Sequence, residues 1–118
     1  MQVFQPTTTY EFKVPRLTPE NKPFEQTFEL PCPLLVHMTV RIPDGHKGLA
    51  HVWITCPKQM ILPAFGSSSR YIEGDGDTIE IYPGIYLDGP PYNFTCHGWS
   101  EDSLLSHSFL LRVTSALG

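Results

Sequence analysis

The sequence predicts an all-β fold: a single-domain antiparallel β-sandwich, jelly-roll-like, with an extended N-terminal arm. Short stretches that alternate apolar and polar residues recur at spacings of roughly 8–12 residues, as in sandwiches and barrels. The 118 residues include 12 Pro and 9 Gly, which favour short strands joined by many turns. No stretch of about ten or more residues keeps the period of an amphipathic helix.

The first 23 residues predict the arm. This segment is rich in Pro and Thr, and chain of that composition is extended and semi-rigid. One short run within it, Tyr10–Val14, can form an edge strand. Such an arm either wraps its own domain or reaches a neighbouring molecule. The sandwich domain is therefore predicted at residues 24–118.

The most regular pattern lies between Leu34 and Cys56. Two alternating runs flank a stretch of turn residues, which predicts a β-hairpin with Ile42 opposite Ala50. One face of this hairpin is apolar and belongs in the core: Val36, Met38, Val40, Ile42, Ala50, Val52, Ile54 and Cys56. The other face carries His37, Thr39, Arg41, His51, Trp53 and Thr55.

Further strands are predicted on both sides of this hairpin. The run Phe24–Leu30 alternates and is typical of a half-buried strand. Later runs predict strands at 78–82, 85–87, 92–99 and 109–114, with shorter pieces at 59–62 and 70–73. On the 92–99 strand, His97 and Trp99 lie on the face opposite Phe94 and Cys96.

Composition and charge narrow the classes of function. Charged residues make up only 17% of the chain, below the usual ~25%, which indicates a surface partly covered by a partner. The net charge is −4 and Lys and Arg do not cluster, which argues against nucleic-acid binding. No apolar run approaches the ~18 residues of a membrane span. The N-terminus lacks the features of a secretory signal, so we expect synthesis in the cytoplasm and a place in an assembled particle.

The three cysteines, Cys32, Cys56 and Cys96, form no C-x-x-C pair. An odd number of cysteines in a chain without a signal sequence indicates free thiols that act as small core hydrophobes. A Cys56–Cys96 disulfide is the alternative, because both side chains can face one core.

Neither a metal site nor an enzyme is predicted. Glu73, Asp75 and Asp77 are candidate ligands for a hard cation such as Ca²⁺, but they lack the EF-hand pattern, and a Gly-rich turn explains them. The five histidines show no metal-binding spacing. The run Ser106-His107-Ser108 is no catalytic dyad, since adjacent strand residues point to opposite faces. No cofactor is expected.

The candidate binding site is an outer sheet face made of Thr39, Arg41, His51, Trp53, His97 and Trp99. Trp anchors interfaces because it combines a large apolar body with a polar tip. Three interpretations stay open: a second core face of the sandwich or a face covered by the arm, a protein interface, and a carbohydrate platform. Coplanar exposed rings with polar neighbours favour sugar, whereas rings covered by another subunit favour assembly.

The predicted organisation of the chain has four features: the arm, the signal-free start, the compact run of strands, and the last strands at 92–99 and 109–114. In this organisation the chain resembles small β-sandwich proteins of tailed-phage virions, of the capsid decoration or head–tail connecting type. The resemblance transfers no functional residue. It implies a structural role on a bacteriophage particle, many copies, protein partners that include itself and other structural proteins, and no catalysis.

These observations predict a non-enzymatic structural protein that docks through the aromatic sheet face and the N-terminal arm. Burial of an apolar, aromatic patch would provide the binding, and repetition over a particle would add avidity. The alternative is a carbohydrate- or ligand-binding β-sandwich module.

Overall fold

A computed structural model describes residues 5–43, 45, 47–56, 59–62 and 76–117 of the chain. Within these residues the protein forms nine strands and no helix. No helix in the described part could therefore cross a membrane. The strands are β1 (Thr7–Val14), β2 (Phe24–Leu30), β3 (Leu34–Arg41), β4 (Ala50–Cys56), β5 (Gln59–Leu62), β6 (Thr78–Ile81), β7 (Ile85–Tyr86), β8 (Tyr92–Ser100) and β9 (His107–Ala116).

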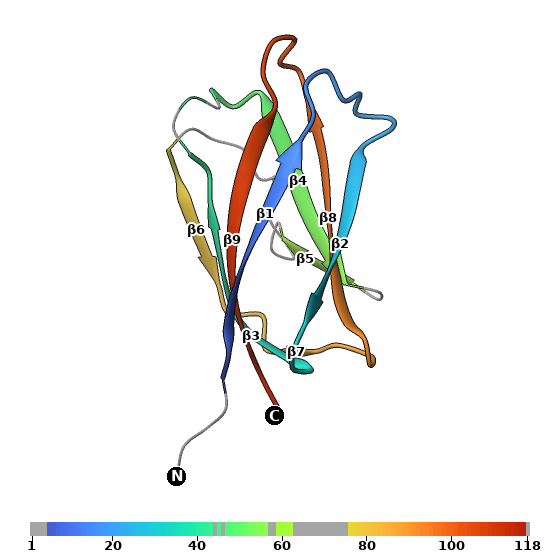
Figure 1. Cartoon of the computed structure of the whole chain (residues 1–118), viewed down its shortest axis with the longest axis vertical. Helices are drawn as coiled ribbons and strands as arrows, with labels where there is room; N and C mark the ends of the chain where they lie inside the picture. The colour runs from blue at the N-terminus through green and yellow to red at the C-terminus, as the bar shows by residue number, and fades with distance from the viewer. Residues whose placement is uncertain (1–4, 44, 46, 57–58, 63–75, 118) are drawn as a thin grey trace.

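The strands form two antiparallel sheets packed face to face (Figure 1). Sheet A has the order β1-β9-β3-β6, and β7 also pairs with β3. Sheet B has the order β2-β8-β4-β5. The predicted all-β antiparallel sandwich is confirmed.

The core lies between the sheets and is built from alternate residues of nearly every strand. The fully buried large side chains include Phe12, Leu30, Leu35, Met38, Ile54, Phe94, Phe109 and Leu111. Most of the apolar face predicted for the 34–56 segment is buried, but Val36 and Cys56 are only partly covered. The register shifts between Leu35 and His37, so that Leu35 takes the core position in place of Val36.

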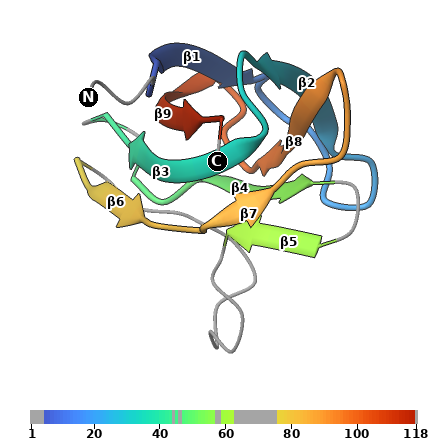
Figure 2. The ribbon, with the colours of Figure 1, turned by 90° about the horizontal axis from the view of Figure 1, so that it is seen from below.

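The predicted hairpin is wrong. β3 and β4 lie in different sheets (Figure 2), and Val40 pairs with Leu111 of β9 and Ile79 of β6 instead of with Val52. Alternation fixes which face of each strand is buried, but it does not fix which strand lies alongside. The connection from Arg41 to Ala50 also exceeds the roughly two to five residues of most hairpin loops.

The N-terminal segment contributes an edge strand to the sandwich. The predicted edge strand Tyr10–Val14 is part of β1, which pairs with β9 from Thr7 to Val14. Phe12 and Val14 are fully buried. The Tyr10 hydroxyl donates to the backbone carbonyl of Glu29 on β2 at 2.6 Å, which links the two sheets at this edge. The division into an arm, 1–23, and a domain, 24–118, stays a prediction.

The cysteines behave as core residues. Cys32 and Cys96 are buried, Cys56 is half-buried, and none of the three is in a disulfide. Burial raises the pKa of the Cys96 thiol, which keeps it protonated and unreactive. The interpretation as small hydrophobes is confirmed, and the Cys56–Cys96 bridge is not formed.

Candidate functional site

The outer face of sheet B carries the same short motif on two neighbouring strands. β4 contains His51-Val52-Trp53, and β8 contains His97-Gly98-Trp99. The strands are antiparallel, so His51 lies opposite Trp99 and Trp53 lies opposite His97. We call these four side chains the His–Trp platform.

The two cross-strand pairs of the platform are stacked. The ring centroids of His51 and Trp99 are 4.0 Å apart, with 20° between the ring planes. Those of Trp53 and His97 are 5.0 Å apart, with 5° between the planes. Residues directly opposite in an antiparallel pair have Cβ atoms about 4.5–5.5 Å apart, so the ladder itself holds the rings at stacking distance. Two adjacent stacks therefore occupy the two middle strands of sheet B.

Each histidine of the platform also lies close to a carboxylate. His51 Nε2 lies 2.8 Å from Glu101 Oε2, and His97 Nδ1 lies 3.4 Å from Glu25 Oε1. The other nitrogen of His97, Nε2, lies 2.8 Å from Thr55 Oγ1. The glutamates are 55% and 57% exposed, so the pairs add little stability. Their effect is to orient the imidazoles and to border the aromatic surface with negative charge.

The structure brings together four of the six predicted site residues. His51, Trp53, His97 and Trp99 meet on sheet B, where His51 is buried and the other three are half-buried. Thr39 and Arg41 are on β3, in the other sheet. They were grouped with Trp53 because of the incorrect hairpin.

Thr39 and Arg41 have other neighbours on the outer face of sheet A. Arg41 Nη1 donates to the Gly76 carbonyl and to Thr78 Oγ1, both at 3.1 Å. Thr39 Oγ1 lies 3.4 Å from His37 Nε2. The Arg41 contacts tie β3 to the start of β6, and the Thr39 contact lies within β3. None of them extends the platform.

Sequence reasoning missed the two glutamates. Glu101 follows Trp99 by two residues, so a search for charge next to the aromatic strand could have found it. Glu25 is opposite His97 only because β2 pairs with β8. No local pattern indicates that pairing.

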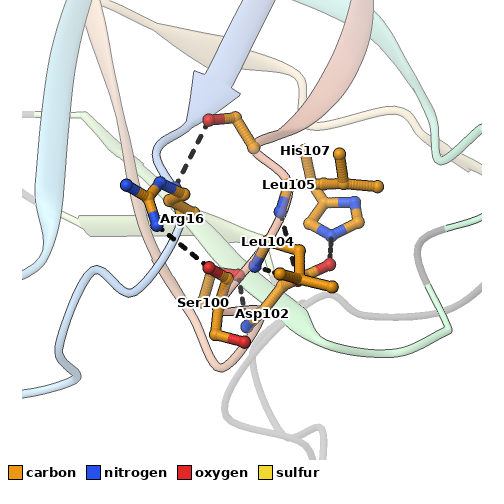
Figure 3. Close-up of polar contacts among 8 residues, drawn as sticks. Arg16, Ser100, Asp102, Leu104, Leu105 and His107 are labelled. Atoms are coloured by element: carbon orange, nitrogen blue, oxygen red, sulfur yellow. Dashed lines mark hydrogen bonds and ion pairs between the residues drawn. The ribbon is translucent and has the colours of Figure 1, made fainter.

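A second polar cluster holds the β8–β9 connection (Figure 3). Asp102 Oδ2 lies 2.6 Å from Nε2 of His107, whose side chain is only 4% exposed. Asp102 Oδ1 accepts the backbone N–H groups of Leu104 and Leu105, at 2.8 and 3.2 Å. The backbone N–H of Asp102 donates to Ser100 Oγ at 3.1 Å. One carboxylate thus organises the whole turn.

The same turn is fastened to the β1–β2 connection. Arg16 donates from Nη1 to the carbonyl of Ser103 at 3.0 Å, and from its backbone N–H to Ser106 Oγ at 3.3 Å. The backbone N–H of Leu17 donates to the carbonyl of Asp102 at 2.9 Å. With Glu101 next to Asp102 in the chain, this bracing positions the carboxylate that contacts His51. We assign the His107–Asp102 pair a structural role, which is to hold the β8–β9 turn in place.

Replacing Asp102 with Asn is expected to lower the melting temperature at neutral pH. The pKa of Asp102 is lowered, first by the Leu104 N–H, then by His107 and the Leu105 N–H. A lowered folded-state pKa stabilises the protein above the ordinary aspartate pKa, and this contribution is lost as the pH falls through the lowered value. The difference between wild type and variant should therefore close in acid.

Thermal melts between about pH 2 and pH 7 would measure this difference. The matched control is Glu29→Gln, which neutralises an exposed carboxylate on β2 and should change the melting temperature much less. A constant difference between wild type and Asp102→Asn at every pH would contradict the assignment.

The predicted cation ligands are only partly placed. Asp77 is exposed, and its backbone carbonyl accepts the N–H of Ile42 at 2.8 Å. Glu73 and Asp75 lie outside the described residues. Among the residues that the structure describes, no three His, Cys, Asp or Glu side chains gather as a metal site. The calcium hypothesis stays untested.

No protein-family model matches this chain, and no curated protein matches it either. We therefore infer function from the geometry of the two sheets and their exposed faces.

Proposed function

We propose that this protein is a non-enzymatic structural protein that docks to protein partners through the His–Trp platform. The observation that carries the proposal is the pair of parallel His–Trp stacks on β4 and β8. Trp is enriched at the centres of interfaces, where a large ring can be buried at a low cost in conformational entropy. Because the backbone ladder already holds the rings in place, binding a partner immobilises few additional side chains.

The arrangement favours a protein over a sugar. Sugar rings pack on flat aromatic faces, but each platform ring gives one face to its stacking partner. The platform is bordered by the exposed carboxylates of Glu25 and Glu101. An aromatic centre with a charged rim has the anatomy of a protein interface.

We further infer a jelly-roll winding and an assembled particle, such as a phage virion, as the setting. The two sheet orders, β1-β9-β3-β6 and β2-β8-β4-β5, support the winding. Strands consecutive in sequence, such as β1 and β2 or β8 and β9, then take corresponding places in the two sheets. Jelly rolls occur in viral capsid proteins and in lectins. This analogy supports the setting but does not determine the function.

The two tryptophans of the chain are both in the platform, so intrinsic tryptophan fluorescence reports on this surface alone. In the complex isolated from the native source, we expect tryptophan emission at shorter wavelength than in the free protein. We also expect weaker quenching by acrylamide, because a docked partner excludes water and quencher from half-buried rings. Steady-state emission before and after dissociation of the complex measures both effects.

Two controls sharpen this test. Tyr86→Ala truncates an exposed aromatic on sheet A and should leave complex formation and emission unchanged. Titration with a panel of saccharides should not shift the emission. Equal quenching in free and bound protein, or a saturable shift with a saccharide, would count against the proposed function.

A further inference from the structure

The free edge of β1, in sheet A, is a second candidate interaction surface besides the His–Trp platform of sheet B. β1 is the last strand of sheet A on its side and pairs with β9 over eight residues without a register shift. Its exposed face carries Thr7, Thr9, Glu11 and Lys13. Ser108 Oγ donates to Glu11 Oε1 at 2.9 Å, which holds this carboxylate on the outer face of the sheet.

One hydrogen bond shows which backbone N–H and carbonyl groups of β1 point toward β9. The N–H of Ser115 donates to the carbonyl of Pro6 at 3.0 Å, in line with the Thr7–Thr114 register. Along an antiparallel pair, the backbone N–H and carbonyl groups of successive residues point alternately toward and away from the partner strand. The even-numbered residues from Pro6 to Val14 therefore point their backbone polar groups toward β9. The N–H and carbonyl groups of Thr7, Thr9, Glu11 and Lys13 therefore point away from β9, along the sheet edge.

This edge carries few of the features that protect a sheet edge. Among the described residues, β1 makes no backbone hydrogen bond to any strand except β9. It contains one lysine, no proline and no bulge, whereas natural edges use these devices to block pairing. Long, regular edges of this kind accept a further strand.

The other three edges differ from it. β5 and β6 have only four residues each. β2 has seven residues, but its outer face carries Glu25 and Glu29. Antiparallel pairing of β2 with a copy of itself, centred on Thr27, would place carboxylate against carboxylate, which is destabilising. β1 carries both signs of charge instead, at Glu11 and Lys13.

We propose that β1 pairs antiparallel with β1 of a second copy of this chain. The dyad passes through Phe12, so that Glu11 lies opposite Lys13 of the partner subunit and Lys13 lies opposite Glu11 of the partner subunit. Each such pair exchanges both backbone hydrogen bonds, because these are the residues whose N–H and carbonyl groups face outward. Opposite charges directly across the two strands favour this register over those centred on Glu11 or Lys13, which would set like charges opposite each other. The ladder runs from Tyr10 to Val14, because Thr9 falls opposite Pro15 of the partner subunit, which has no N–H.

The dimer joins the two A sheets into one continuous sheet and leaves both His–Trp platforms uncovered. It is independent of the proposed docking function, since it uses a different sheet. A dimer with two platforms would bind a repetitive partner bivalently, and linked binding raises avidity without new contacts.

Charge reversal tests the pairing. In sedimentation equilibrium, the wild-type protein is expected to dimerise. Glu11→Lys and Lys13→Glu, each alone, should raise the dimer dissociation constant at least about tenfold, because both cross-strand pairs become like-charged. Mixing the two single variants should restore the association as a heterodimer, since every pair is again opposite in charge. The double variant should restore the homodimer.

The matched control is Lys22→Glu, a charge reversal at an exposed lysine between β1 and β2, which should leave the dissociation constant unchanged. Circular dichroism of each variant checks that the sandwich is folded. A wild-type protein that stays monomeric at its highest soluble concentration would overturn the proposal. So would single variants that dimerise as tightly alone as they do when mixed.

Discussion

Phe12→Ala is expected to lower the free energy of unfolding by about 3–5 kcal/mol, the usual cost of truncating a buried phenylalanine. Phe12 is fully buried, and its ring stacks on Phe24 of β2 with centroids 5.8 Å apart. Its removal leaves a cavity where β1 meets sheet B. Domains of this size are stable by only about 5–15 kcal/mol, so the loss is a large fraction of the total.

Urea denaturation followed by circular dichroism measures this loss. The matched control is Thr9→Ala, on the same strand, whose side chain is on the exposed face of β1. That change should stay within about 0.5 kcal/mol of wild type. Equal, small effects of both changes would show that the N-terminal segment is a detachable arm and that the sandwich folds without it.

Gly98→Ala is expected to destabilise the protein by about 1–3 kcal/mol through overpacking. Gly98 lies on the inner face of β8, between the two aromatic residues of the motif. A Cβ atom there would lie 2.6 Å from Val14 Cγ2, 3.0 Å from Phe12 Cε2 and 3.3 Å from Val52 Cγ2. Valine side chains are stiff at χ1, so the closest contact cannot be relieved by a simple rotation.

A double-mutant cycle with Val14→Ala tests the cause. Removing Val14 Cγ2 removes the closest contact, so Gly98→Ala should cost less in the Val14→Ala background than in wild type. Denaturation curves of the four proteins give the coupling. Strictly additive effects would contradict the view that β1 side chains press against Gly98.

Fold class was predictable because it depends on local alternation. Each strand shows its buried face in its own residues, as Met38, Val40 and Ile54 illustrate. Pairing was not predictable, because it depends on which strands meet across long stretches of chain. The same alternation is compatible with two strands paired in a hairpin and with two strands in opposite sheets. In the structure, β3 and β4 lie in different sheets.

The platform was half predictable for the same reason. The outward placement of Trp53 and His97 follows from strand parity. Their stacking depends on the β4–β8 register, which links residues far apart in the sequence. The His107–Asp102 pair does not follow from strand parity, because Asp102 lies five residues before His107, across a turn.

The most direct test of the docking proposal is acrylamide quenching of Trp53 in a Trp99→Phe variant. Phenylalanine preserves an aromatic partner for His51, and Trp53 becomes the sole fluorophore of its kind. We expect quenching of Trp53 to fall when the protein is in its native complex. Quenching that is the same in the free and assembled protein would show that the platform faces solvent in both states and is not the docking surface.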